Sequence, residues 1–595
     1  MALRRGVALV LTFVGMAAVV SIAGILFLYL LVSRGPDVPQ QATLVLRPGG
    51  ALVEVPPDDV VGQVLGRDAA TVRGFVDSLR MAKRDPRIST VLLMPTSLDL
   101  PFWGKVQELR DAVLDFRRSG KTVVAFLEYG GDREYYLATA ADRVFLLPTS
   151  PLDLAGVASY EVFLRGTLDK IGAYPDFVWV GAYKTAVNQL TERGFTPAHR
   201  EMSESLNRDM YAQLVRGIAE ARKKSEDEVR ALLDEGPFAP EDALAAGLVD
   251  ELAYLDQLDD RVPALKPGSG EPRRVEGSEY ARTSPRAAGF QPRSRIAVLY
   301  ASGVIASGRS SFDAVNGAVL GSDTMVEHIR RVREDDSIRA IVLRVDSPGG
   351  SSVASDVIWR ELMITRDEKP SRPLIVSMSD LAASGGYYIA MPGHVIVAQP
   401  ATLTGSIGIY GGKIAIGGTA EKLGVTTETV KSGRNADITS PFATFTPEQR
   451  IKLQAYMQGF YENFVRKAAT SRRMTPEQLD AVAQGRVWTG QQARDRGLVD
   501  ALGGLDAAVA IAKERANIPA DEDVELVNYP PRRTLFEALR EEFGASGLSA
   551  GSVFGAGRVL LFGPAEARAM AALTAPMRLF RRGEPLALMP FAFVR

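Results

Sequence analysis

The chain has 595 residues, of which 46% are hydrophobic and 24% are charged, and its formal net charge at pH 7 is −1. This composition predicts a large globular body with two or three cores, and it offers no basic face for a nucleic-acid partner. Cysteine is absent, which excludes thiol catalysis, cysteine zinc sites and disulfides. No motif in the chain calls for a metal or a cofactor, and we expect neither.

The first structural element predicted along the chain is a membrane anchor. An uncharged run of 28 residues, Gly6 to Ser33, lies between Arg5 and Arg34. A membrane-spanning helix needs about 20 residues, whereas a cleaved signal peptide usually has an apolar core of about 7–15 residues. Arg4 and Arg5 outweigh Arg34, so the positive-inside rule places the amino terminus in the cytoplasm. We therefore expect a single-pass protein of the bacterial inner membrane, with the rest of the chain on the periplasmic side.

The chain repeats itself at a separation of about 250 residues. The tetrapeptide Gly-Leu-Val-Asp at 247–250 recurs at 497–500, and the Tyr-Tyr pair at 135–136 recurs at 387–388. Short apolar strands alternate with helical segments such as 322–333 and 355–365, a pattern typical of βαβ units and a parallel sheet. The predicted domains are 1–41 (amino terminus, transmembrane anchor and short linker), 42–256 (first repeat), 257–293 (polar linker), 294–529 (second repeat) and 530–595 (a C-terminal extension of unknown role).

Two glycine-containing loops in the second repeat suggest a catalytic site. Ser384 follows the apolar run 374–376 and is followed by Gly385, Gly386 and an apolar stretch with helical character. At such a strand-to-helix turn, backbone amides and the helix dipole face developing negative charge. The second loop, Ser-Pro-Gly-Gly at 347–350, ends the apolar run 340–343. Each loop alone is also typical of an ordinary turn, but together they predict a nucleophilic serine on an exposed turn beside an oxyanion hole.

The base expected beside a nucleophilic serine is not a histidine in this chain. Its three histidines, His199, His328 and His394, do not lie in loops that resemble catalytic turns. A lysine made neutral by burial is the known alternative. A lysine is therefore the expected base.

The duplication indicates which lysine to consider. Subtracting 252 from Ser384 gives Asp132, so the first repeat has no nucleophile, and it also lacks the glycine pair. It does contain Lys184, in the segment 181–186 that follows the apolar run 177–180, while the matching positions of the second repeat, 434 to 436, hold no lysine. An ordinary solvated cation is the alternative reading of Lys184. Each repeat thus lacks the residue that the other one has, and this pattern nevertheless predicts that the serine and the lysine meet across the two repeats. Tyr183, Val180 and Trp179 are then expected to line the amine as apolar walls.

Four segments together resemble one known family. They are Ser-Gly-Gly-Tyr-Tyr at 384–388, the Ser-Pro-Gly-Gly loop, Leu-Thr-Gly-Ser-Ile-Gly-Ile at 403–409 and Gly-Ala-Tyr-Lys-Thr-Ala at 181–186. They are similar to the signal peptide peptidase A family, also called protease IV, in its long duplicated form. The resemblance implies an α/β fold of tandem duplicated Clp protease/crotonase-like repeats preceded by one N-terminal transmembrane helix.

The resemblance also assigns roles to residues. It implies that Ser384 is the nucleophile, that Lys184 is the general base, and that Ser406 orients the lysine amine. Gly385 would supply one oxyanion amide and Gly349 or Gly350 the other, and which member of that pair does so stays open.

The function that follows is a membrane-anchored serine endopeptidase with a Ser-Lys dyad. By resemblance it would cleave apolar peptides such as signal-peptide remnants left after precursor processing, and it would be a homo-oligomer, a tetramer. Two alternatives stay open at this point. A crotonase-like acyl-CoA enzyme can use two amide-bearing loops to hold a thioester enolate, and a membrane scaffold would use neither loop for catalysis.

Overall fold

The computed structural model describes residues 36–55, 71–266, 271–313, 317–531, 585–589 and 593–594, together with the single positions Met16 and Gly24. Apart from those two positions, the predicted anchor from Gly6 to Ser33 lies outside the described residues. Among the residues that are described, no helix is both long and apolar enough to cross a membrane.

The first repeat is built on a parallel sheet of six strands in the order β10-β1-β2-β3-β5-β9. These strands are β1 (Ala42–Leu46), β2 (Ile88–Leu93), β3 (Thr122–Leu127), β5 (Arg143–Leu146), β9 (Glu251–Leu252) and β10 (Arg274–Glu276). The helices are α3 (Val72–Arg84), α4 (Gly104–Arg117), α5 (Asp132–Ala138), α6 (Arg165–Ile171), α7 (Asn188–Thr191), α8 (Pro197–Arg222), α9 (Glu226–Glu235), α10 (Pro240–Ala245), α11 (Leu258–Arg261) and α12 (Gly277–Tyr280). The central strands are buried on both faces, which explains why they read as continuous apolar runs.

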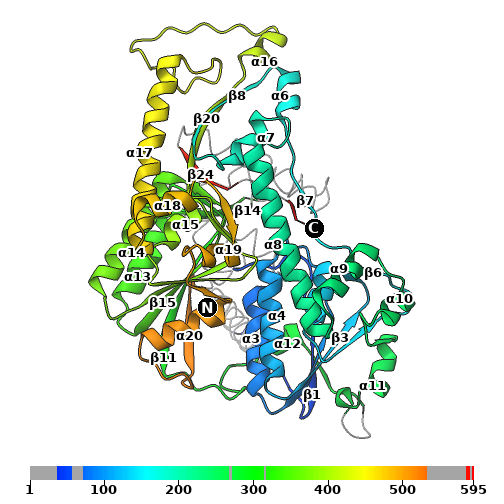
Figure 1. Ribbon diagram of the computed structural model, residues 1–595. Coiled ribbons are helices and arrows are strands. Elements are labelled where there is room, and N and C mark those ends of the chain that lie inside the picture. Colours follow the sequence, from blue (N-terminus) through cyan, green and yellow to red (C-terminus); the bar gives the residue numbers. More distant parts are fainter. Residues whose placement is uncertain are drawn as a thin grey trace, which may run out of the picture.

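The second repeat has the same sheet order, β23-β11-β15-β17-β18-β22, again with parallel pairing. Its strands are β11 (Ser294–Ser302), β15 (Ile338–Ser347), β17 (Leu374–Ala383), β18 (Val395–Ala398), β22 (Ala501–Leu502) and β23 (Val524–Tyr529), with β19 (Leu403–Gly405) and β21 (Val487–Thr489) beside β17. Its helices are α13 (Ser322–Glu334), α14 (Ser352–Glu368), α15 (Gly385–Ala390), α16 (Gly417–Lys422), α17 (Pro447–Arg472), α18 (Pro476–Val482), α19 (Gly490–Asp495) and α20 (Leu505–Arg515). The predicted α/β fold and tandem duplication are confirmed (Figure 1).

The sequence matches that indicated the duplication make equivalent contacts in the two repeats. The hydroxyl of Tyr135 donates to the carbonyl of Leu248 at 2.6 Å, and the hydroxyl of Tyr387 donates to the carbonyl of Leu498 at 3.0 Å. Asp250 also forms an ion pair with an arginine of α8, as its counterpart does with α17. These motifs therefore hold each repeat together and do not belong to a catalytic site.

The folded part of the first repeat extends beyond the predicted boundary at 256. The segment 257–293, predicted as a polar linker, contributes α11, α12 and the edge strand β10, which pairs with β1. Strand β10 takes the place that β23 takes in the second repeat. Because only one of its three residues is buried, it carries no apolar run from which a strand is recognised.

A mixed sheet joins the two repeats. Its order is β13-β14-β12-β16-β24-β20-β8, where β8 (Tyr174–Val180) comes from the first repeat and β20 (Ile409–Ala415) from the second. The two strands pair antiparallel over seven positions, from Ile409 opposite Val180 to Ala415 opposite Tyr174, and they run side by side in Figure 1. The other members are β12 (Val304–Ala306), β13 (Ser311–Asp313), β14 (Gly317–Gly321), β16 (Gly349–Ser351) and β24 (Leu586–Leu588).

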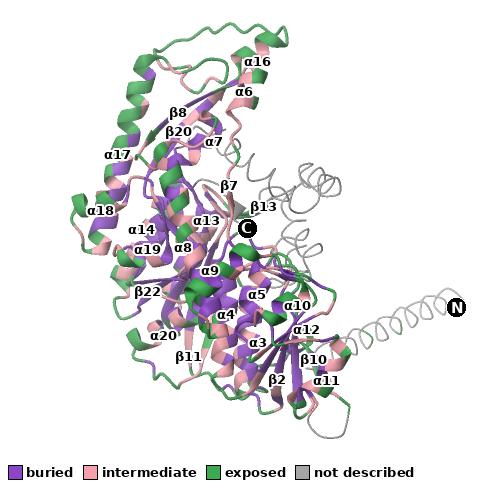
Figure 2. Ribbon diagram, turned by 45° about the vertical axis from the view of Figure 1, so that its right-hand side comes forward, coloured by how far each residue is buried: buried purple, intermediate pink, exposed green. Residues whose placement is uncertain are grey.

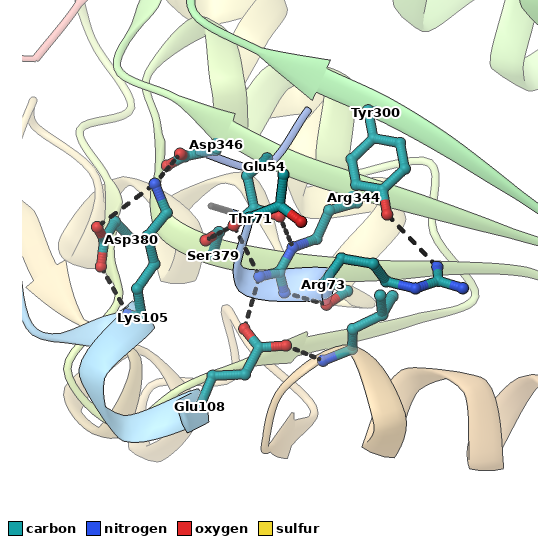
Figure 3. Close-up of polar contacts among 12 residues, drawn as sticks. Glu54, Thr71, Arg73, Lys105, Glu108, Tyr300, Arg344, Asp346, Ser379 and Asp380 are labelled. Atoms are coloured by element: carbon teal, nitrogen blue, oxygen red, sulfur yellow. Dashed lines mark hydrogen bonds and ion pairs between the residues drawn. The ribbon is translucent and has the colours of Figure 1, made fainter. Parts of the chain in front are cut away.

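A buried ionic cluster also links the repeats (Figure 3). The guanidinium of Arg344 on β15 contacts both carboxylate oxygens of Glu54 at 2.8 and 2.9 Å, and it also binds Glu108 of α4. Burial alone would raise the pKa of Glu54, but Arg344 outweighs it and lowers the pKa to about 2. Removing one partner of a buried ion pair typically costs about 3–5 kcal/mol. A shift of one repeat relative to the other would separate these ion pairs, so the cluster stabilises the observed arrangement of the two repeats.

Candidate active site

Ser384 occupies the turn between β17 and α15, as the sequence predicts. Its φ is 56° and its ψ is −112°, a left-handed backbone conformation that L-residues with a side chain adopt only at a cost. The turn is held because the Ser384 amide donates to the Gly405 carbonyl at 2.7 Å and the Ser384 carbonyl accepts from the Tyr388 amide at 2.9 Å. The backbone is thus strained at the residue proposed to react.

Lys184 of the first repeat meets Ser384 of the second. Lys184 follows β8 and is 1% exposed. Its Nζ lies 2.7 Å from Ser384 Oγ, 3.0 Å from Ser406 Oγ and 3.0 Å from the Ser406 carbonyl oxygen. The two residues are 200 positions apart in the chain, and the pairing of β8 with β20 brings them together.

The surroundings of the Lys184 amine favour its neutral form. Burial lowers the pKa of Lys184 well below its ordinary value of 10.5, and none of the described carboxylates forms an ion pair with it. A neutral amine has two N–H donors and one lone pair. If the two donors go to the two oxygens of Ser406, the lone pair remains for the Ser384 hydroxyl.

Two glycines, Gly485 and Gly408, make room for Lys184. A Cβ on Gly485, whose φ is 76°, would lie 2.6 Å from Lys184 Cα, and a Cβ on Gly408 would lie 3.1 Å from Lys184 Cδ. The neighbouring Gln484 carbonyl accepts from the Tyr183 amide at 2.8 Å. The lysine backbone is therefore clamped against the second repeat. This contact could not be predicted from the sequence, because a glycine in a turn does not indicate which distant residue packs against it.

Two expectations about the surroundings of the site are wrong. Ser384 is not on an exposed turn but has no exposed surface, since Lys184 contacts its hydroxyl and β16 and β24 lie against the neighbouring Gly385. Trp179 is not a wall of the lysine pocket, since it is 41% exposed. It alternates with Val178 and Val180 along β8, so its side chain lies on the other face of the strand.

The glycine pair lies beside Ser384 and Gly385. The φ angles of Gly349 and Gly350 are 104° and 155°. The Gly349 amide donates to Ser347 Oγ at 3.2 Å, so it is not free to donate to an oxyanion. A Cβ placed on Gly385 would lie 3.1 Å from the Gly350 nitrogen. The geometry thus favours Gly350, with Gly385, as the pair of amides that face one carbonyl oxygen.

The first repeat has lost the equivalent chemistry. Asp132, the counterpart of Ser384, begins α5, and its carboxylate accepts from the amides of Ala155 and Gly156 at 3.1 and 2.8 Å. The counterparts of Lys184, residues 434–436, lie in an irregular segment. Among the described residues no cluster of histidine, aspartate and glutamate could hold a metal ion.

Known proteins match the chain across both repeats. Peptidase family S49 matches residues 115–266 and 366–519. The chain is 35% identical over 472 residues to the chloroplastic serine protease SPPA of Arabidopsis thaliana, which covers 78% of this chain and 68% of the relative. It is 34% identical over 455 residues to Protease 4 of Salmonella typhi, with coverages of 75% and 72%.

Solved structures give only a weak match. A mutant of the membrane-bound stomatin-specific protease 1510-N matches at 16% identity, covering 40% of this chain and 100% of that one, with a TM-score of 0.25. A TM-score this low supports no conclusion about the fold, which is instead described by the strand order.

The strain at Ser384 leads to a prediction about two variants. Both Ser384→Ala and Ser384→Gly should lose peptide hydrolysis, because both lack the hydroxyl. Glycine accepts a left-handed backbone without strain, so Ser384→Gly should exceed Ser384→Ala in free energy of unfolding by about 1 kcal/mol. Denaturant unfolding and turnover of an apolar peptide measure the two effects. Wild-type turnover by Ser384→Ala would overturn the site, and equal stabilities would overturn the strain.

Proposed function

The chain belongs to peptidase family S49 and is a serine endopeptidase, and we propose that Ser384 is its nucleophile and Lys184 its general base. The observation that carries this proposal is the 2.7 Å contact between Lys184 Nζ and Ser384 Oγ. It is made by a lysine whose pKa burial lowers. Membership of the family sets aside the acyl-CoA enzyme and the silent scaffold.

In the first half of the reaction, neutral Lys184 takes the hydroxyl proton as Ser384 Oγ attacks the substrate carbonyl carbon. The oxyanion that forms accepts hydrogen bonds from the amides of Gly385 and Gly350. One such donor is typically worth about 3 kcal/mol of barrier. Lys184 then gives its proton to the leaving amine, and the peptide bond breaks.

In the second half, water attacks the carbonyl carbon of the acyl-enzyme ester while Lys184 takes a proton from that water. The bond from the acyl carbon to Ser384 Oγ then breaks, Lys184 returns the proton to Oγ, and the acid product leaves. Ser406 holds the amine in place throughout, because its hydroxyl and its carbonyl both contact Nζ at 3.0 Å. Its own φ of 50° shows that this turn is also in a left-handed conformation. The step order needs no metal and no cofactor.

We assign apolar peptides, including signal-peptide remnants, as the substrate class. Strands β16 and β20 lie on either side of one extended strand, β24. Beside that position Phe177, Leu190 and Tyr410 form a buried apolar cluster. An extended apolar segment gains backbone hydrogen bonds on both edges and buries its side chains there.

The place of action follows from the amino terminus. We propose that Gly6 to Ser33 anchors the protein in the bacterial inner membrane as a single span. The arginines at positions 4 and 5 would keep the amino terminus in the cytoplasm, and the catalytic repeats would lie in the periplasm. Peptides remaining in the bilayer would then lie close to the enzyme.

Two segments support a homo-oligomer. They are the counterparts of β8 and β20 in the other repeat, and within the described chain they do not pair with each other. The counterpart of β8 is 424–430, which is exposed and in no strand; it follows α16, in the exposed upper part of Figure 2. The counterpart of β20 is 159–165, of which only β7 (Ser159–Tyr160) is a strand, paired with β25 (Phe593–Val594). Since β8 and β20 join the repeats within one chain, their copies would join two chains head to tail and close a ring. A tetramer is the size that the family resemblance implies.

The ring predicts a specific effect of charge at Val430. Val430→Lys should dissociate the oligomer in detergent, because it places a lysine on the proposed intermolecular strand. Val357→Lys is the matched control, since Val357 is exposed on α14, away from that strand. Sedimentation velocity distinguishes the forms. A wild type that sediments as a single copy, or a Val430→Lys variant with unchanged mass, would contradict the proposal.

The lysine base predicts how activity depends on pH. Turnover of an apolar peptide should rise with pH and level off below 10.5, because only the neutral amine accepts the serine proton and burial lowers the pKa of Lys184. The measurement is kcat/KM as a function of pH, with Lys184→Arg as an inactive control. A flat profile, or a rise centred on the ordinary lysine pKa, would rule out the base.

Stability provides the control for that experiment. Between the folded and unfolded pKa values of Lys184 the unfolded chain binds more protons, so the free energy of unfolding rises with pH in that interval. Lys184→Met has no amine to neutralise. At neutral pH it should be inactive yet more stable than the wild type, by about 1.4 kcal/mol for each unit by which the pKa is lowered.

A further inference from the structure

A pocket of about 780 Å³ lies at the C-terminal end of α15, whereas Ser384 lies at the N-terminal end of that helix. The C-terminal parts of α14, α17 and α20 form it, together with the loop 391–394. Two carboxylates, those of Asp500 and Glu514, line the pocket. Six cationic side chains line it as well, and they are Arg366, Arg466, Lys467, Arg472, Arg473 and Arg515. The pocket is therefore separate from the catalytic site and carries an excess of positive charge.

Most of these cations have no carboxylate partner. Lys467 pairs with Asp356, and Arg472 pairs with Asp500. The other four cations are arginines, and none of them forms an ion pair with a carboxylate of the described residues. Guanidinium groups gathered in this way create a positive potential that attracts anions.

The first repeat holds a carboxylate at the position of His394. Subtracting 252 from His394 gives Asp142, and each of these residues directly precedes a strand, β18 or β5. The Val123 amide donates to the Asp142 carboxylate at 2.8 Å, and Arg117 Nε donates to the same carboxylate at 2.8 Å. Arg117 also donates to the Ala140 carbonyl at 2.9 Å. In the first repeat this arginine is thus neutralised by the chain itself.

The second repeat has the same arrangement except for the carboxylate. The Leu374 amide donates to His394 Nδ1 at 3.0 Å, and Arg366 donates to the Pro392 carbonyl at 2.8 Å. Both contacts match contacts of the first repeat, but His394 brings no negative charge. Arg366 therefore lacks the carboxylate that its counterpart has.

The helix dipole does not account for this difference. Arg366 and Arg515 lie in the last turns of α14 and α20, where the dipole favours a cation. Arg117 likewise lies in the last turn of α4, and its carboxylate partner is present. The dipole thus explains why arginines lie at these helix ends, but it does not explain why one repeat supplies an anion and the other does not.

His394 adds a hydrogen-bond donor to the pocket. Because the Leu374 amide donates to Nδ1, the neutral ring carries its hydrogen on Nε2. Burial lowers the pKa of His394, and the charges of Arg366 and Arg515 lower it further. The ring is therefore neutral at pH 7, and it joins two guanidinium groups as a donor in the same pocket.

We propose that this pocket binds an anionic phosphate group between Arg366, His394 and Arg515. Phosphate oxygens match the planar fork of an arginine, and a phosphate has more acceptor oxygens than a carboxylate to share among three donors. The phosphate would supply the negative charge that Asp142 supplies in the first repeat. It can belong to an anionic lipid headgroup or to a soluble phosphate. The inference does not depend on Ser384 or on the proposed function.

Calorimetric titration of the full chain in detergent with inorganic phosphate tests the site. We expect saturable binding by the wild type, and weaker binding of acetate at the same ionic strength. His394→Asp places a carboxylate beside Arg366, so the affinity for phosphate should fall about tenfold or more. His394→Asn is the matched control, because its amide oxygen accepts from the Leu374 amide without adding charge. Its affinity should stay within about threefold of the wild type.

Arg515→Gln is a second variant that removes one guanidinium. Arg515 is exposed, so its replacement should leave folding intact, and thermal unfolding checks this for each variant. The affinity for phosphate should again fall about tenfold.

Modification of His394 by diethyl pyrocarbonate identifies the source of the phosphate. His394 is exposed, whereas His199 and His328 are buried, so mass spectrometry of the modified peptide reports on the pocket. The full chain is placed in nanodiscs of phosphatidylcholine alone, or of phosphatidylcholine and phosphatidylglycerol in equal parts. Protection by phosphatidylglycerol without added phosphate identifies a lipid headgroup. Protection only after addition of inorganic phosphate identifies a soluble ligand.

Four results would overturn the phosphate site. They are a wild type without saturable phosphate binding, acetate that binds as tightly as phosphate, an affinity that is unchanged in His394→Asp and Arg515→Gln, and a His394 that stays unprotected in every nanodisc sample. None of these measurements involves peptide hydrolysis, so their failure leaves the proposed peptidase standing.

Discussion

A buried lysine amine that pairs with none of the described carboxylates is the constraint on which the rest of the structure depends. Lys184 is almost fully buried and lies 2.7 Å from Ser384 Oγ, and an ammonium in that position would lack its hydration. Burial therefore favours the neutral amine, and it does so only while the two repeats stay docked. The antiparallel pairing of β8 with β20 and the Arg344 cluster with Glu54 and Glu108 maintain that docking.

Duplication explains how one site came to need two repeats. Both sheets have the same strand order, and Tyr135 and Tyr387 make equivalent contacts. The two repeats share a scaffold, but the first copy has Asp132 where the second has Ser384, and the Asp132 carboxylate accepts from two amides. A carboxylate there stabilises the turn without chemistry. The single site is consequently a property of the interface between the repeats.

The sequence predicted the parts of this arrangement that leave a local signal. The offset of about 250 residues, the Ser384 turn and the complementary loss of lysine all follow from residue types and spacing, and the resemblance added Ser406. The clamp by Gly485 and the choice of Gly350 over Gly349 depend on distances between segments far apart in the chain. Strand β10 was missed because a polar edge strand has no apolar run, and β24 because its groove is formed by residues more than 150 positions away.

The central claim is that Ser384 reacts only because neutral Lys184 removes its proton across the repeat boundary. The rate at which a fluorophosphonate labels Ser384 tests this directly, because labelling needs the activated serine but no substrate binding. The account predicts rapid labelling of the wild type that falls as pH is lowered, and labelling reduced to background in Lys184→Met at every pH. Equal labelling of the wild type and Lys184→Met would contradict it.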